Sequence, residues 1–182
     1  MEGLPLHPVL VHLPLGLCGL IPLVAIIVIL GIKLNWFSSR IWLLVVLLQA
    51  SILAGTVVAK ETGEHEEDVV EKIVPHMYIG EHEEAAEGFA VAVGVVLILT
   101  MAGAIPKKKV ASAAQLLSVA GMLAVIYFAV DAGHSGGDLV YRYGAGRVYE
   151  SILNPGKDLA IPAGNSTINQ NVSGSHNDDD DK

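Results

Sequence analysis

Residues 8–32 read PVLVHLPLGLCGLIPLVAIIVILGI, a long apolar run without an Asp, Glu, Lys or Arg. Crossing the hydrocarbon core of a bilayer takes about 20 predominantly apolar residues in a helix. Three later stretches also meet this requirement, at 41–59, 86–105 and 110–133. The sequence therefore predicts an all-α integral membrane protein whose four spans pack as a four-helix bundle.

Composition supports a membrane protein and excludes several other classes. Hydrophobic residues make up 52% of the chain, and the mean hydropathy is +0.53. One buried helix of a soluble protein could resemble a span, but four such segments in so short a chain could not. No basic stripe indicates nucleic-acid binding, and neither a phosphate-binding glycine loop nor a nucleophile elbow is present. The lipid bilayer is thus the first expected partner.

Basic residues in two short loops predict the orientation. Lys33 and Arg40 flank the first loop, and 107–109 is a run of three lysines in the last loop. The positive-inside rule places both loops in the cytoplasm. We therefore expect a multi-pass protein of the plasma (inner) membrane with the N-terminus, the C-terminus and the acidic connection at 60–85 outside.

The chain divides into a membrane domain and a tail. Residues 1–150 are expected to form the four-span domain, and 151–182 a flexible tail. The final DDDDK at 178–182 looks like an enteropeptidase-type tag remnant, so His176 is set aside. Cys18 is the only cysteine and is expected to be a small buried apolar residue, which excludes intramolecular disulfides.

Six histidines lie at, or just beyond, the same end of the apolar segments, and the opposite ends carry none. They are His7, His12, His65, His76, His82 and His134. Ionisable side chains at membrane depth are costly and usually functional. This one-sided distribution predicts a cofactor site on the periplasmic or exterior side.

The first two histidines flank the start of the first span. Pro8 suits a first helical position, which puts His7 just outside the helix and His12 about one turn within it. Five residues rotate a helix by about 500°, so these two side chains point about 140° apart. We expect His12 to point into the bundle or along its outer mouth as a ligand, the alternative being a structural hydrogen bond.

His134 ends the fourth span in a patterned segment. Tyr127, Asp131 and His134 are spaced to share one helix face. A carboxylate beside an imidazole is the usual partner that orients a ligating histidine. Gly136 and Gly137 remove side-chain bulk where a planar cofactor could approach. The alternative is a glycine-rich helix stop with a capping histidine.

The acidic connection contains the near-duplicate strings GEHEE at 63–67 and 80–84. One is expected to extend the second helix beyond the membrane and the other to open the third, so that the two face each other. Their carboxylates and imidazoles, including His65 and His82, suit zinc, copper, manganese or non-haem iron. For most of the acids, a solvated cap is the simpler interpretation.

Two compact motifs carry a family resemblance. LHPVLVHLP at 6–14 and GHSGGDLVY at 133–141, followed by Tyr143 and Gly144, resemble the signature blocks of a bacterial four-helix membrane family of unknown function. The resemblance covers roughly residues 4–150, and His82 matches a histidine near the start of that family's third span. Members of the family occur beside or fused to redox modules such as Rieske iron–sulfur domains. The resemblance therefore implies electron transfer, with b-type haem as the cofactor.

Haem in a helical bundle needs two axial imidazoles from facing helices and small residues against the porphyrin. Four histidines match the family, so one or two haems could be held. We expect His12 and His134 as the first ligands, with Asp131, Gly136 and Gly137 around them. His82 and His7 come second. Quinol or an external redox protein would exchange electrons with this subunit of an oxidoreductase.

Two other functions fit the same residues. A non-haem metal protein, serving as a sensor, transporter or oxidase, would use zinc, copper or iron at these four histidines and His65. A structural assembly subunit would satisfy its histidines with hydrogen bonds. Small-residue faces at 16–19 and 88–94 suit close helix packing within one chain or between two, so a homodimer is also considered.

Overall fold

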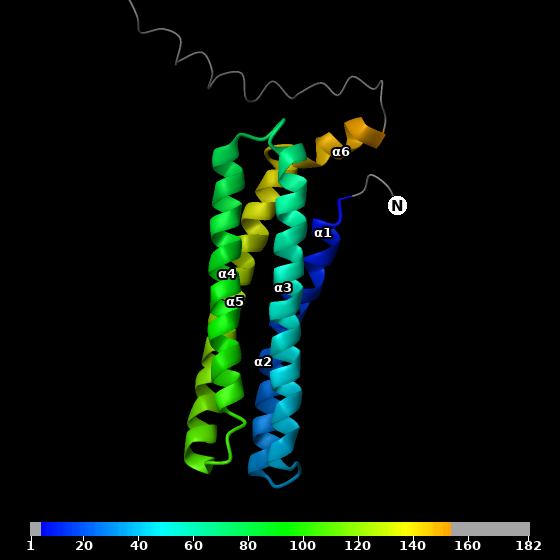
Figure 1. Cartoon of the computed structure of the whole chain (residues 1–182). Helices are drawn as coiled ribbons and strands as arrows, with labels where there is room; N and C mark the ends of the chain where they lie inside the picture. The colour runs from blue at the N-terminus through cyan, green and yellow to red at the C-terminus, as the bar shows by residue number, and fades with distance from the viewer. Residues whose placement is uncertain (1–4, 154–182) are drawn as a thin grey trace, which may run out of the picture.

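A computed structural model describes residues 5–153, all of whose regular structure is helical (Figure 1). The predicted tail at 151–182 therefore lies outside the described residues after Leu153. The elements are α1 (His7–Leu10), α2 (His12–Lys33), the 3₁₀ helix η1 (Ser39–Ile41), α3 (Trp42–Val70), α4 (His76–Ala102), α5 (Lys108–Tyr141) and α6 (Ala145–Leu153).

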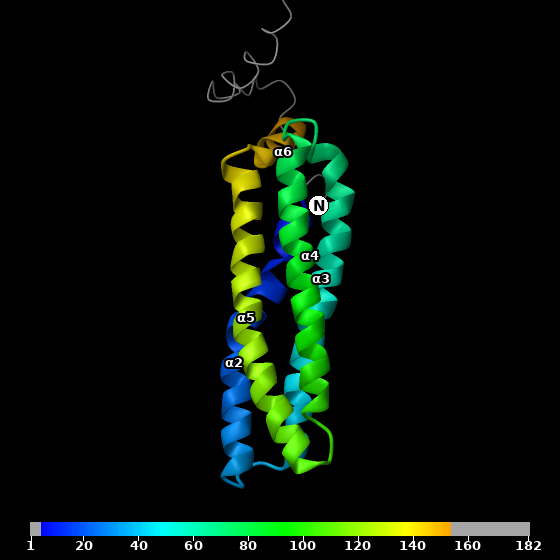
Figure 2. The same ribbon diagram turned by 90° about the vertical axis from the view of Figure 1, so that its left-hand side faces the viewer.

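The four long helices α2 to α5 alternate in direction and form one elongated bundle (Figures 1 and 2). The short connections α2–α3 and α4–α5 lie at one end, which we call the basic end because of Lys33, Arg40 and 107–109. The α3–α4 turn, α1 and α6 lie at the other, acidic end. Four segments are long and apolar enough to cross a membrane, beginning at His7, Ser39, His76 and Lys108, which confirms the four predicted spans.

The helices are longer than the predicted spans. The stretch 60–85, expected as a connection, is mostly helix, because α3 runs to Val70 and α4 begins at His76. Glu is a good helix former, so the acidic strings continue the helices beyond the apolar region. The GEHEE strings extend α3 and lie in the first turns of α4, as expected. At 1.5 Å per residue α5 is about 51 Å long, against a hydrocarbon core of about 30 Å.

Glycines near His134 do not stop the helix. The α5 helix passes through Gly136 and Gly137 and ends at Tyr141, so the helix-stop interpretation is wrong. Two glycines cost a helix roughly 1–2 kcal/mol, which the long contact between α4 and α5 offsets. The chain turns at Gly144, whose φ of 83° suits glycine, and enters α6, a helix that we did not predict.

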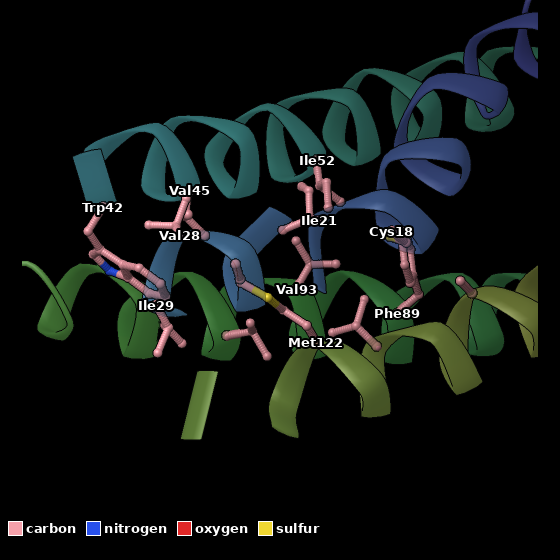
Figure 3. Packing of buried hydrophobic residues seen from close by; sticks show 14 of the residues in the cluster. Cys18, Ile21, Val28, Ile29, Trp42, Val45, Ile52, Phe89, Val93 and Met122 are labelled. Atoms are coloured by element: carbon pink, nitrogen blue, oxygen red, sulfur yellow. The ribbon is translucent and has the colours of Figure 1, made fainter. Parts of the chain in front are cut away.

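The core contains side chains from all four long helices. Figure 3 shows Ile21 of α2, Ile52 of α3, Val93 of α4 and Met122 of α5 among the buried side chains. Cys18 lies in the same cluster, buried as a small apolar residue as predicted. Apolar side chains such as Leu23, Leu47, Ile98 and Leu123 stay exposed on the outside of the bundle, which suits contact with lipid.

Trp42 should be important for packing near the basic end. Its indole Nε1 donates to the Thr100 carbonyl of α4 at 2.8 Å, and its side chain is fully buried. We expect Trp42→Phe to lower the unfolding free energy by about 1–3 kcal/mol, because it loses this bond and leaves a cavity. Trp36, which is 74% exposed, is the matched control, and Trp36→Phe should change little. Unfolding of both variants by SDS titration checks this; equal losses would contradict it.

Candidate functional site

Two histidines from distant parts of the sequence meet at the acidic end. The ring centroids of His7 on α1 and His82 on α4 lie 6.0 Å apart, with their planes at 83°. Both side chains are half-buried. The bundle therefore brings together one histidine from each of two segments that the sequence analysis had considered separately.

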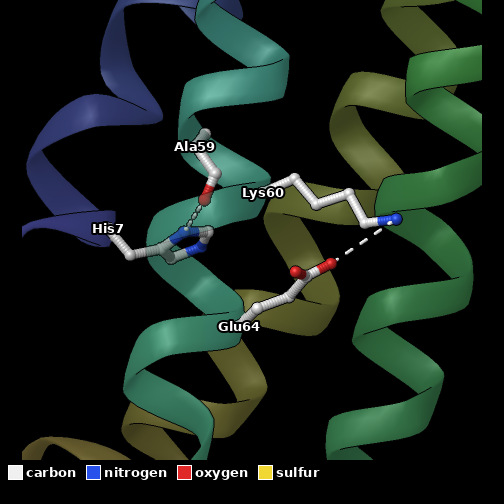
Figure 4. A network of polar contacts seen from close by, with 4 residues as sticks. All are labelled: His7, Ala59, Lys60 and Glu64. Atoms are coloured by element: carbon white, nitrogen blue, oxygen red, sulfur yellow. Dashed lines mark hydrogen bonds and ion pairs between the residues drawn. The ribbon is translucent and has the colours of Figure 1, made fainter.

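The hydrogen bond of His7 defines its tautomer. Its Nδ1 lies 2.7 Å from the carbonyl oxygen of Ala59 on α3 (Figure 4). A carbonyl only accepts hydrogen bonds, so Nδ1 must carry the proton and donate. In the neutral ring, Nε2 then keeps a free lone pair. Figure 4 also shows the neighbouring Lys60–Glu64 ion pair, at 3.6 Å, along the same helix.

His82 has the same tautomer for a different reason. Its Nδ1 lies 2.9 Å from the hydroxyl oxygen of Ser135 on α5. That hydroxyl donates its only proton to the Ala132 carbonyl at 3.1 Å. Ser135 must therefore accept from His82, which places the imidazole proton on Nδ1 and leaves Nε2 as a base. In this tautomer the Nε2 atom of each ring carries no proton.

Two glycines let the rings lie close to the helices. A Cβ on Gly63 of α3 would come within 3.1 Å of the His7 Nδ1 atom, and one on Gly136 of α5 within 3.0 Å of the His82 Cε1 atom. A Cβ on Gly137 would have no neighbouring atom within 4 Å. Gly136 therefore makes room for a histidine ring, and the structure shows no such contact for Gly137.

Glu66 holds the chain segment that carries His7. One carboxylate oxygen accepts from the backbone N–H groups of Leu6, at 2.6 Å, and His7, at 3.1 Å. The other accepts from the hydroxyl of Tyr149 on α6, at 2.9 Å. Burial and this bond to a carboxylate raise the pKa of Tyr149, so its phenol remains a donor. Sequence reasoning missed Glu66, Ser135 and Tyr149, because their roles depend only on packing.

The other predicted ligands lie apart from the pair. His12 is exposed, and its Nδ1 lies 2.5 Å from the Pro8 carbonyl one turn earlier. His65 and His76 are also exposed, and His76 lies 3.8 Å from Glu67. Within 5–153, no three His, Cys, Asp or Glu side chains converge as a metal-binding group. The structure does not bring His12 and His134 together, although the sequence analysis ranked them first.

His134 lines a separate polar cavity between α4 and α5. This cavity has a volume of about 230 Å³ and also contains Asp131, as the shared helix face predicted. Its remaining walls are Tyr78, Glu81, Ala85, Ser135, Asp138 and Tyr143. Ser135 thus belongs both to this cavity and to the hydrogen bond that orients His82. Tyr78 and Tyr143 stack at 3.8 Å, which gives the cavity one aromatic wall.

Comparison with known proteins identifies a family. Residues 3–148 match the family described as predicted membrane protein (DUF2231). No curated protein and no solved structure matches the chain. The matched range covers α1 to α5 and includes every residue of the histidine pair and the cavity.

Proposed function

This chain belongs to the DUF2231 family of predicted membrane proteins, and from its site we propose a membrane electron-transfer subunit that holds one b-type haem through His7 and His82. The observation that carries the proposal is the paired rings 6.0 Å apart, each with a free Nε2. The same tautomer on both rings is what an iron with two axial imidazoles requires.

The spacing of the rings supports a single shared metal. A metal–nitrogen distance of about 2.1 Å and about 1.1 Å from Nε2 to the ring centre place two axial imidazole centroids roughly 6.4 Å apart. The observed 6.0 Å is comparable. A metal between these rings would bind neutral imidazoles whose Nδ1 protons are already held by oxygen atoms, which fixes ring orientation and raises ligand basicity.

Haem iron would supply one-electron chemistry at this position. The protein would contribute the axial ligands, their hydrogen-bonded partners Ala59 and Ser135, and a location at the acidic end. By the positive-inside rule this end faces the periplasm. From 61 to 84 the chain carries nine acidic residues and one lysine, which would steer a basic redox protein toward the site.

The alternative of a carboxylate-rich metal site has less support. Glu61, Glu64 and His65 are exposed on α3, whereas His82 turns toward α5 and bonds to Ser135. A zinc, copper or non-haem iron ion would therefore also be expected at the His7–His82 pair. The two proposals differ in the porphyrin and can be separated by spectroscopy.

The test is a visible spectrum of the detergent-purified protein in oxidised and reduced forms, with a pyridine haemochrome assay and elemental analysis. A Soret band, a sharp reduced α-band and about one iron per chain are expected. A colourless protein with stoichiometric zinc, copper or iron would replace haem by a non-haem metal. If the protein binds neither haem nor metal after both are supplied, both cofactor proposals are rejected and the structural assembly role is supported.

Substitution of Gly136 should weaken cofactor binding through His82. A methyl group there meets the ring at 3.0 Å and must displace it by a few tenths of an ångström. We expect Gly136→Ala to reduce haem affinity about tenfold, the lower end of the effect of disturbing a ligand's support. Gly137→Ala, which meets nothing within 4 Å, is the control and should bind haem normally. Equal affinities measured by haem titration would contradict this prediction.

A further inference from the structure

The polar cavity at His134 continues into an apolar groove along the membrane-spanning part of α4 and α5. The groove has a volume of about 870 Å³ and shares Glu81, Ala85 and Asp131 with the cavity. The apolar part of its lining on α4 extends from Gly88 to Leu99, which corresponds to about 17 Å along a helix. A polar chamber at the membrane surface is thus joined to an apolar groove that runs along about half of the hydrocarbon depth.

The two parts differ sharply in chemistry. The inner part of the groove is walled by Val91, Val95 and Leu99 on one side and by Phe128 on the other, whereas Glu84 and Glu87 line its outer part. The cavity instead offers the carboxylates of Asp131 and Asp138 and the imidazole of His134. A ligand that fills both must have a compact polar head and a long apolar tail.

We propose that the cavity and groove bind an isoprenoid quinol, with its hydroquinone head at His134 and its tail between α4 and α5. The proposal rests on the proposed haem function, because it names the electron donor for that site. Carboxylates and an imidazole can accept hydrogen bonds from the two quinol hydroxyls, and such bonds to charged acceptors are strong. A phosphate head would instead face the carboxylates of Glu81 and Asp131, which disfavours a phospholipid in the cavity, whereas Asp138 is paired with Arg142 at 3.9 Å.

The position of Ser135 links this head group to the histidine pair. Its side chain lines the cavity and accepts the hydrogen bond from His82. Oxidation of one quinol to the quinone releases two protons and two electrons. The protons would pass to the carboxylates and imidazole at the cavity wall. The two electrons would leave one at a time to an external one-electron acceptor, and a haem held by His7 and His82 would supply the one-electron chemistry between the two.

Photolabelling tests the site without relying on haem. The full chain in phosphatidylcholine nanodiscs is irradiated with an azido-quinone carrying an isoprenoid tail, and labelled peptides are identified by mass spectrometry. We expect labels on α4 and α5 around the cavity and groove, and loss of labelling when excess decylubiquinol is added. Labels spread over all lipid-facing helices, or labelling that quinol does not compete away, would overturn the proposal.

Two variants and a control sharpen this test. Ala85→Phe fills the junction of cavity and groove, and Asp131→Asn removes one acceptor without adding bulk. Asp131→Asn should reduce specific labelling about tenfold, the effect of losing one charged hydrogen bond, and Ala85→Phe should reduce it at least as much because the added ring occupies the junction. Ala120→Phe places the same bulk on an exposed position of α5 outside the groove and should label normally. Equal labelling in all three variants would refute the site, as would displacement of the label by phosphatidylethanolamine as effectively as by quinol.

The haem proposal and the quinol proposal can fail independently, and their failures give different results. His82→Ala should lose haem but keep specific quinone labelling, since His82 does not line the cavity. A protein that labels specifically but never binds haem would support the quinol site and reject the haem function. Haem binding without specific quinone labelling would support the haem function and reject the quinol site.

Discussion

The His82→Ala and His7→Ala variants should each lose the Soret band of the purified protein, with haem affinity reduced by about a hundredfold or more. Loss of a ligand should exceed the 10- to 100-fold effect of altering the groups around it. The two rings lie 6.0 Å apart and present the only Nε2 atoms that the described structure brings into such a pair. Haem titration of the detergent-purified variants, followed at the Soret band, measures the effect.

The matched controls are the two histidines that the sequence analysis ranked first. His12→Ala and His134→Ala remove exposed imidazoles outside the pair and should retain haem binding within about twofold, far less than the 10- to 100-fold expected when a ligand's support is altered. Circular dichroism on each variant separates loss of the ligand from loss of the fold. Retention of haem in His82→Ala together with its loss in His134→Ala would reject the pair and restore the original ranking.

The fold could be predicted from sequence because the bilayer imposes a simple requirement. Four long apolar runs, separated by basic short loops and an acidic connection, predicted four helices. The helices α2 to α5 contain all four runs. The helix ends were misplaced, and α6 was not predicted. The apolar pattern ends where the membrane ends, whereas Glu-rich helix α3 continues to Val70 through good local propensity.

The pairing of histidines could not be predicted in the same way. The sequence indicated that His7 and His12 point in different directions, but not which of them faces the bundle. That depends on the break at Val11, which separates α1 from α2, and on the approach of α1 to α3. The environment of His82 could not be predicted either. Its ring lies against Ser135 and Gly136 of α5, and these contacts form only when α4 packs against α5.

The second prediction with a large effect concerns Glu66, which holds the segment that carries His7. Glu66 accepts hydrogen bonds from Leu6, His7 and Tyr149, and so ties the N-terminal segment and α6 to α3. We expect Glu66→Ala to lower the local stability of the N-terminal segment by about 2–3 kcal/mol, as for hydrogen bonds to a charged group. Amide hydrogen exchange at residues 6–10 should accelerate by about 30- to 160-fold, and haem affinity should fall because His7 is no longer positioned.

A neighbouring glutamate provides the control for this experiment. Glu67 is the next residue on α3, but it pairs with the exposed His76 at 3.8 Å, and such a surface pair contributes at most about 1 kcal/mol. Glu67→Ala should leave exchange at residues 6–10 unchanged. The α6 helix should respond less than α1 to Glu66→Ala, because Ala145 and Val148 remain buried. If both glutamate variants accelerate exchange equally, the effect comes from lost acidic charge at this end of the bundle, and Glu66 does not position His7.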